Sequence, residues 1–363
     1  MVPRERIVNL PRRKFLHLAA GAAALPALSR IARAQTYPTR PVRLIAGFPP
    51  GGGTDVMARL IGQSLSERLG QPLVIENRPG AASNIGTEAV VRAVPDGYTL
   101  LLAGINNAIN ATSYEKLNFN FIRDITPVAA IGGVPAIMAV HPSFPAKTIP
   151  EFIAYAKANP GKVNMASEGI GGVGHLLGEM FKMMAGINMV HVPYRGIALG
   201  LTDVMGAQVE VIFSSTPATL PYIMSGALRA LGVTTAKRSQ VLPGVPAVGE
   251  FLPGYDASIW YGVGVPKKTP TEIVEKLNKE INAVLADPKL KARLAEIGAE
   301  PMMMAPAEFA SFVAYETEKW AKVIRQHQGA VRSGGSLGHA TDCWLAAPRQ
   351  APGQNTVRGP PMR

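Results

Sequence analysis

Two glycine-rich loops in the sequence have the composition of sites that hold an anion. Residues 48–55 read Phe-Pro-Pro-Gly-Gly-Gly-Thr-Asp, and residues 79–86 read Pro-Gly-Ala-Ala-Ser-Asn-Ile-Gly. In each case a strand-like run precedes the glycines and a helical pattern follows them. Glycine lets the backbone approach a ligand closely, and the free N–H groups at a helix N-terminus attract negative charge. Strand-to-helix turns also use glycine for geometry alone, so each loop is a candidate anion cradle.

A third glycine-rich segment has the spacing of a dinucleotide-binding loop. Residues 169–174 fit the pattern GxGxxG, after a possible strand at residues 163–166 and before a helical pattern. Such a site also needs an acidic residue about 20 positions further on to hold the ribose hydroxyl. Residues 190–195 offer no acid, although Arg195 would suit a phosphorylated cofactor. An exported dinucleotide-dependent oxidoreductase is therefore kept only as an alternative.

Other catalytic or metal-binding patterns are missing from the sequence. It contains no Walker loop, no GxSxG elbow and no HExxH motif. His141, His175 and His191 are widely spaced and are expected to be structural rather than metal ligands. Glu168 and Glu179 are expected to be solvated surface acids rather than a catalytic pair. We therefore predict a protein without cofactor or metal that is not an enzyme.

The elements that position the loops follow an α/β pattern. Short apolar runs that read as strands, at residues 43–48, 73–75 and 99–103, alternate with helical patterns. The first helix is expected at residues 54–69, with one apolar face, and the second begins near Ile85. This alternation is typical of an α/β fold with largely parallel sheets.

Three later helices have well-marked ends. Thr148 with Glu151 forms a capping box for a helix that stops at residues 159–161. Residues 269–272 are expected to cap a helix that runs to Asp287 in the same way. The last helix is expected from about Pro306 to Arg325, with apolar residues on one side.

The first 34 residues have the features of an export signal. Arg12 and Arg13 lead into an apolar stretch at residues 15–28, which is followed by the small-x-small sequence Ala-Arg-Ala before Gln35. The arginine pair matches a twin-arginine signal, read by the export machinery. A plain Sec signal and a retained membrane anchor are the alternatives. We expect cleavage, and a mature protein that is soluble in the periplasm.

Residues 327–363 differ from the rest of the chain. They are rich in Gly, Pro and Arg, have no apolar period and contain Cys343, the only cysteine, so the folded body is expected to lack a disulfide. We expect this segment to be disordered, either as a natural tail or through a reading-frame shift.

The net charge of +12 does not indicate nucleic-acid binding. Residues 1–34 contain seven basic residues and one acid, and residues 327–363 contain four basic residues and one acid. The remainder has mixed signs and no basic run that would follow a phosphate backbone. Nucleic acid is therefore not an expected partner.

Four segments carry a recognisable pattern: residues 46–55, 76–81, 95–101 and 191–196. Together they resemble the Bug-type receptors of tripartite tricarboxylate transporters, also called the TctC-like family. The resemblance runs from about Tyr37 to Arg325. It implies a two-domain clamshell of the type II periplasmic-binding-protein class, in which each domain is a mostly parallel sheet flanked by helices. By analogy, domain I comprises residues 35–135 and 260–326, and domain II comprises residues 136–259, with chain crossings near residues 131–140 and 258–265.

The resemblance also implies a function and a site. Receptors of this kind bind a small carboxylate in the interdomain cleft and deliver it to a large and a small membrane subunit; a periplasmic sensory receptor that feeds a signalling system is the alternative. Residues 82–83, 105–107 and 197–200 depart from the usual pattern, so the ligand stays unassigned. The ligand-binding residues carried over are Phe48, Pro50, Gly51, Gly52, Asp55, Gly80, Ala81, Asn106, Asn107, Ser167, Gly169, Gly196, Ser214 and Ser215.

Overall fold

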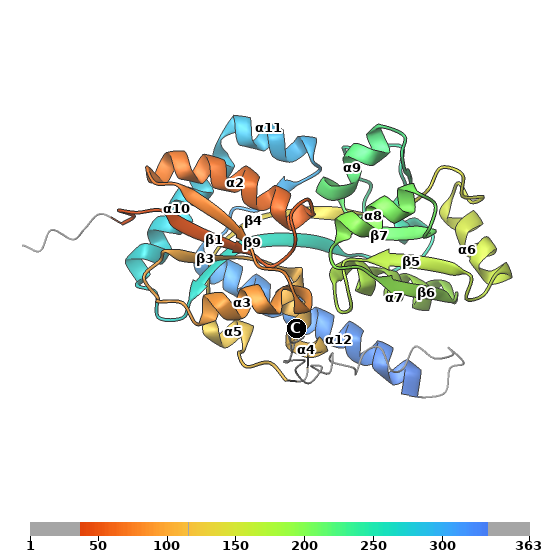
Figure 1. The fold of residues 1–363 in the computed structure, drawn as a ribbon, viewed down its shortest axis with the longest axis horizontal. Helices are drawn as coiled ribbons and strands as arrows, with labels where there is room; N and C mark the ends of the chain where they lie inside the picture. The colour runs from red at the N-terminus through yellow and green to blue at the C-terminus, as the bar shows by residue number, and fades with distance from the viewer. Residues whose placement is uncertain (1–36, 115, 333–363) are drawn as a thin grey trace, which may run out of the picture. The chain divides into compact units, whose positions relative to one another are not determined.

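The computed structural model describes residues 37–114 and 116–332 (Figure 1). Residues 1–39 and 40–363 form separate units, and the account below concerns the second. The expected signal peptide at residues 1–34, and residues 333–363 of the expected tail, lie outside the described residues. Within the described part of the chain, no helix combines the length and apolar character needed to cross a bilayer.

Three parallel strands near the start of the chain form what we call the first parallel group. The strands β1 (Val42–Ala46), β2 (Leu73–Asn77) and β3 (Thr99–Gly104) lie in the order β2-β1-β3. Helix α2 (Gly53–Leu69) connects β1 to β2 and ends where Gly70 takes a left-handed φ of +66°. Helix α3 (Asn84–Val91) precedes β3. These elements match the strands and helices expected from the apolar pattern, with ends that differ by one or two residues.

A second parallel group has the same construction. Strands β5 (Val163–Ser167), β6 (Met189–Pro193) and β7 (Val211–Ser215) lie in the order β7-β5-β6. Helix α7 (Val173–Ala185) connects β5 to β6, and helix α8 (Ile197–Met205) connects β6 to β7. In both groups each strand leads, directly or through a short loop, to the start of a helix, so helix starts gather at the carboxyl ends of the strands.

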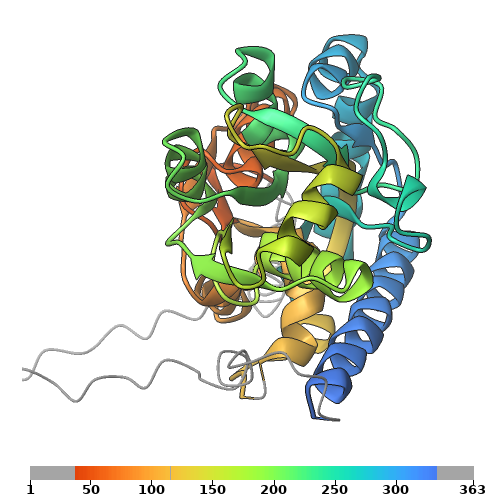
Figure 2. The same cartoon turned by 90° about the vertical axis from the view of Figure 1, so that its right-hand side faces the viewer.

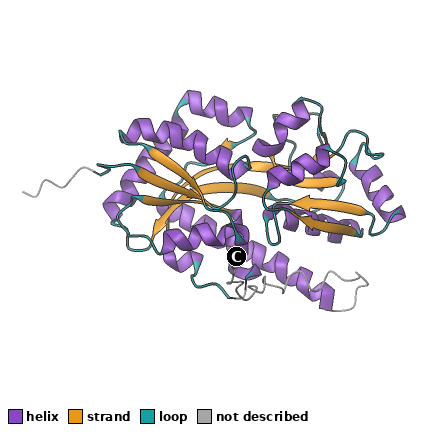
Figure 3. Cartoon of the chain, in the orientation of Figure 1, coloured by secondary structure: helices purple, strands orange, loops and turns teal. Residues whose placement is uncertain are grey.

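Two long antiparallel strands join the groups into one mixed sheet. Strand β4 (Ile125–Val140) pairs with β9 (Ser258–Pro266) up to Pro135, and from Ala136 onward it pairs with β7 and with β8 (Arg229–Val233). Strand β9 also pairs with β3. The strand order is therefore β2-β1-β3-β9-β4-β7-β5-β6, and helices flank the strands on both faces (Figure 3).

The remaining elements complete the α/β layers. They are η1 (Ala81–Ser83), α4 (Ile105–Ser113), α5 (Phe121–Asp124), α6 (Ile149–Ala158), α9 (Thr216–Met224), η2 (Val248–Glu250), α10 (Thr271–Ala286), α11 (Pro288–Glu296), β10 (Glu300–Pro301) and α12 (Pro306–Arg332).

Two expectations about helix ends need correction. Thr148 caps α6 as expected, because its side chain accepts a hydrogen bond from Glu151 N at 3.3 Å. Thr269 does not cap α10: its hydroxyl donates to Pro266 O at 2.8 Å, and α10 begins without a side-chain cap. Helix α12 runs to Arg332 rather than to Arg325, since extending an existing helix costs little.

The last helix is held by its apolar face. Phe309, Val313, Trp320 and Ile324 are buried, as the sequence pattern indicated. The helix packs against α4 and against the long strand β4 (Figure 2). In this way the last described helix supports α4, which follows β3 directly.

Candidate ligand-binding site

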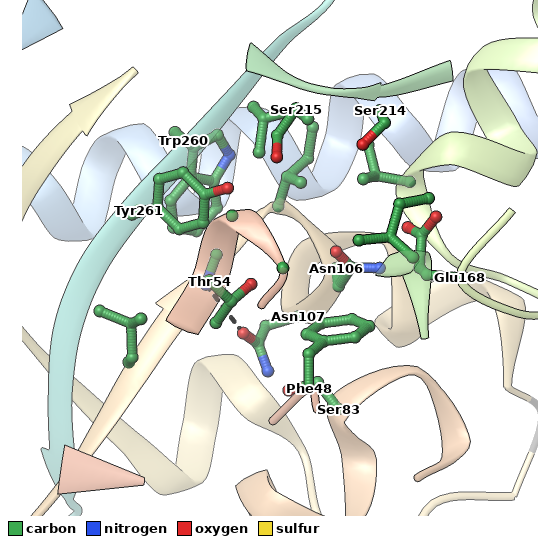
Figure 4. A pocket seen from close by; sticks show the side chains of 18 of the residues that line it. Phe48, Thr54, Ser83, Asn106, Asn107, Glu168, Ser214, Ser215, Trp260 and Tyr261 are labelled. Carbon is green, nitrogen blue, oxygen red and sulfur yellow. Dashed lines mark hydrogen bonds between the residues drawn. The ribbon is translucent and has the colours of Figure 1, made fainter. Parts of the chain in front are cut away.

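A cavity lies where the carboxyl ends of both parallel groups meet β9 (Figure 4). The space open to the centres of water molecules is about 60 Å³, whereas one water needs about 10–15 Å³ by this measure, so the cavity has room for several water molecules. The residues that line it are Phe48, Pro49, Gly52, Gly53, Thr54, Ser83, Leu102, Ala103, Gly104, Ile105, Asn106, Asn107, Glu168, Val173, Ile197, Phe213, Ser214, Ser215, Ile259, Trp260 and Tyr261.

The loop between β1 and α2 brings backbone N–H groups to the cavity. Gly52 is the N-cap of α2 and no side chain caps this helix end, so the first N–H groups of the helix have no intrahelical acceptor. Gly53 lies close to the second parallel group and to β9, because a Cβ atom there would overlap Ser215 Oγ and the Tyr261 hydroxyl. Glycine at position 53 is therefore required for this approach.

Asp55 holds the loop but does not line the cavity. Its carboxylate accepts hydrogen bonds from Gly51 N at 3.1 Å and from Asn77 Nδ2 at 3.0 Å, and Arg59 lies 2.9 Å away. Burial alone would raise the pKa of Asp55, but the hydrogen bonds from Arg59, Gly51 and Asn77 outweigh it and lower the pKa. Asn77 also donates to Phe48 O at 3.0 Å. Asp55 thus acts on the ligand site only by positioning the loop.

The first turn of α4, which follows β3 directly, provides two asparagines with different surroundings. Asn107 accepts from Gly104 N at 2.9 Å and donates to Thr87 Oγ1 at 2.7 Å, so its amide is largely committed to the start of α4. Asn106 Nδ2 is buried and has no hydrogen-bond partner among the described residues. The free donor that the start of α4 offers to a ligand is therefore Asn106 Nδ2.

Strands β7 and β9 add further polar atoms. Ser214 Oγ and Trp260 Nε1 are buried, and neither has a hydrogen-bond partner in the part of the chain that the structure describes. Burial raises the pKa of Tyr261, so its hydroxyl stays protonated and can donate. Buried polar atoms without partners are costly, which suggests that a bound molecule supplies the missing bonds.

Glu168 corrects the interpretation of the GxGxxG segment. Its Oε1 accepts from Gly174 N at 3.0 Å, and a Cβ atom at Gly172 or Gly174 would overlap the Glu168 side chain. The glycines thus make room for this carboxylate at the start of α7, the place where a dinucleotide phosphate would sit. The expectation that Glu168 is a solvated surface acid is wrong, because it lines the cavity.

Ser167 belongs to a polar cluster that includes His191 and does not line the cavity. Its Oγ lies 2.6 Å from His191 Nε2, and His191 stacks on His175 with ring centroids 3.8 Å apart. Glu179 is also buried, contrary to expectation, and bonds Lys182 Nζ at 2.8 Å. Burial, and then the charge of Lys182, lower the pKa of His191 to about 4. Among the described residues, no group of three or more His, Cys, Asp or Glu side chains is placed to hold a metal.

The structure places the expected site residues in two sets. Those that line the cavity are Phe48, Gly52, Asn106, Asn107, Ser214 and Ser215. Those that do not line it are Pro50, Gly51, Asp55, Gly80, Ala81, Ser167, Gly169 and Gly196. Gly196, which belongs to the second set, lies where the two parallel groups approach each other, because a Cβ atom there would overlap the Pro49 ring.

Sequence reasoning missed several polar and aromatic lining residues. They are Thr54, Ser83, Glu168, Phe213, Trp260 and Tyr261. Thr54 directly follows the glycines of an expected cradle and could have been included on that ground. Trp260 and Tyr261 lie within an apolar strand, and nothing in the strand pattern separates a cavity side chain from a core side chain.

Comparisons with known proteins agree with this architecture. Residues 57–328 match the family model described as "Tripartite tricarboxylate transporter family receptor". The chain belongs to this family. It is a family of periplasmic binding proteins rather than enzymes, as the resemblance implied. "Protein BugT" of Bordetella pertussis is 37% identical over 296 residues, which are 81% of this chain and 91% of that protein.

Solved relatives have the same fold. An R. palustris protein solved with adipate is 38% identical with a TM-score of 0.78, over 80% of this chain and 98% of the other. MatC from Rhodopseudomonas palustris, with bound malate, is 30% identical with a TM-score of 0.75, over 79% of this chain and 100% of the other. These likenesses confirm the predicted α/β periplasmic-binding-protein fold.

Proposed function

We propose that this chain is an extracytoplasmic receptor that binds a small carboxylate in the cavity and delivers it to the large and small membrane subunits of a tripartite transporter. The family supports the transport role, and the relatives solved with adipate and malate support a carboxylate ligand. The observation that carries the proposal is the uncapped N-terminus of α2, whose Gly52 and Gly53 line the cavity.

The electrostatics of that helix end suit one carboxylate. A helix N-terminus carries about half a positive charge, and its free N–H groups can donate to both oxygens of a carboxylate. No Lys, Arg or His is found among the described lining residues, so amides and hydroxyls, rather than an arginine fork, would hold the anion. This arrangement costs less side-chain ordering than binding by long cationic side chains does.

The two parallel groups are proposed to move as two lobes. Residues 35–135 and 260–326 would form the first lobe, residues 136–259 the second, and β4 and β9 the connection between them. Close approach of Gly53 to Ser215, and of Gly196 to Pro49, supports a conformation in which the lobes are closed around the cavity.

A thermal-shift screen of the chain from Gln35 onward tests the proposal. Small mono- and dicarboxylic acids, malate and adipate among them, are compared with uncharged amides of the same length. A ligand that binds only the native state raises the melting temperature with concentration by mass action. We expect at least one acid to stabilise the protein while its amide does not. Stabilisation by nicotinamide dinucleotides, with no effect of any acid, would contradict the proposal.

A further inference from the structure

Glu168 is the only charged residue among the described residues that line the cavity. The loop that carries it is shaped around the carboxylate, with space provided by Gly172 and Gly174 and an N–H donated by Gly174. Burial raises the pKa of Glu168, although the N–H groups of Gly174, of Glu168 itself and of Val173 act in the opposite direction. The side chain thus has backbone donors that orient it, and no cation among the lining residues to neutralise it.

Unsatisfied polar atoms lie next to this carboxylate. Figure 4 shows Glu168 in the same part of the cavity as Asn106 and Ser214. Asn106 is 7% exposed and Ser214 is 3% exposed, and the described residues provide no partner for Asn106 Nδ2 or Ser214 Oγ. This end of the cavity is therefore polar, and its one ionisable group is a carboxyl with no cation beside it among the described lining residues.

A ligand that spans the cavity meets opposite electrostatics at its two ends. Next to α2 it meets free N–H groups, which favour a carboxylate. Next to Glu168 a second carboxylate would meet another carboxyl group with no lysine, arginine or histidine in the described lining to compensate, and two carboxyl groups at one site cannot both stay ionised. An ammonium group there would form a charge-assisted hydrogen bond instead. The aromatic lining residues Phe48, Phe213 and Trp260 are also compatible with a cation.

We propose that Glu168 makes this receptor selective for a carboxylate that carries a protonated amine at its far end, and against a dicarboxylate of the same length. The proposal rests on the carboxylate-binding function proposed above and names the ligand class of that same site. It distinguishes this chain from the relatives solved with malate and adipate, which are dicarboxylates.

Titration calorimetry with matched ligands tests the selectivity on the unmodified protein. Two series are used: succinate, 4-aminobutanoate and butanoate, and adipate, 6-aminohexanoate and hexanoate. We expect the amino acid that fits to bind about tenfold more tightly than the dicarboxylate of the same length, as one charge-assisted bond implies. Equal or tighter binding of the dicarboxylates overturns the selectivity and leaves the carboxylate function intact. Binding of none of these acids, nor of any acid in the wider screen, contradicts both proposals.

The variant Glu168→Gln tests whether Glu168 is the source of the selectivity. It keeps the size of the side chain and removes the charge, so we expect about tenfold weaker binding of the amino acid, unchanged binding of the monocarboxylate and tighter binding of the dicarboxylate. Glu250→Gln is the matched control, because Glu250 pairs with Arg238 at the surface and does not line the cavity. Melting temperatures establish that both variants are folded. An unchanged preference in Glu168→Gln overturns the assignment even if the unmodified protein prefers the amine.

Discussion

Gly52 and Gly53 have different functions although they are neighbours. Gly52 has φ and ψ of −86° and 168°, a conformation open to any residue, and a Cβ there would meet Ile197 Cγ2 only at 3.4 Å. Gly53 has no such space, because Ser215 and Tyr261 occupy it. A side chain at position 52 should therefore affect the ligand, and one at position 53 should affect the packing of α2.

The first prediction concerns how the anion is held. Gly52→Val should weaken ligand binding by about 100-fold or more while the protein stays folded, because the branched side chain enters the cavity next to the free N–H groups. Arg195→Gln should change the affinity by less than about threefold, since Arg195 is exposed and does not line the cavity. Both affinities are measured by titration calorimetry with an acid identified in the screen. The opposite pattern would indicate a site based on charge pairing.

The second prediction concerns Gly53. Gly53→Ala should reduce the free energy of unfolding by about 1–3 kcal/mol, the usual cost of overpacking, because its Cβ overlaps two side chains. Urea unfolding of Gly53→Ala and of the unmodified protein measures the difference. Equal midpoints and slopes for the two proteins would show that Ser215 and Tyr261 move aside at no cost.

At the scale of elements, the sequence predicted the features that depend on neighbouring residues. It missed those that depend on contacts between segments far apart in the chain. The strands, α2 and the Thr148 cap follow from apolar spacing and from one side chain at a helix start. Glu168 was missed because its place in the cavity depends on glycines four and six residues later and on β7. Thr269 has the right residue type for a cap, but its hydroxyl bonds Pro266 O instead. Contacts between distant segments decide such cases.

The third prediction concerns His191 of β6, which stacks on His175 of α7. Because the pKa of folded His191 is about 4, below its ordinary value of 6.5, the unfolded chain takes up the proton first as pH falls. The stability contributed by neutral His191 is thus complete above pH 6.5 and is lost on acidification toward pH 4. Between pH 7 and pH 5 the loss should be about 2 kcal/mol.

The variant His191→Gln checks this loss. It cannot take up the proton, so its free energy of unfolding should fall less over the same interval, as measured by urea unfolding at both pH values. If the variant keeps the full pH dependence of the unmodified protein, another group is responsible.

At the scale of the whole molecule, the fourth prediction concerns export. Arg12 and Arg13 match a twin-arginine signal, whose receptor reads the guanidinium pair rather than the charge alone. Replacing both with lysine should make precursor accumulate in the cytoplasm, as measured by fractionation and immunoblotting. A control with Arg4 and Arg6 replaced by lysine should be exported normally. Unchanged delivery of the double variant to the periplasm would favour a Sec signal.

The strand order also determines when each part of the sheet can be completed during synthesis. Strand β3 ends at Gly104, but its neighbour β9 starts at Ser258, about 150 residues later. At about 5–20 residues per second, the ribosome needs roughly 8–30 s to make that neighbour. The second parallel group, the end of β4 and its other partner β8 have all been made by Val233. The half of the sheet that begins later is therefore the first that can be finished, and the half that begins first keeps an open edge at β3 until β9 has been made.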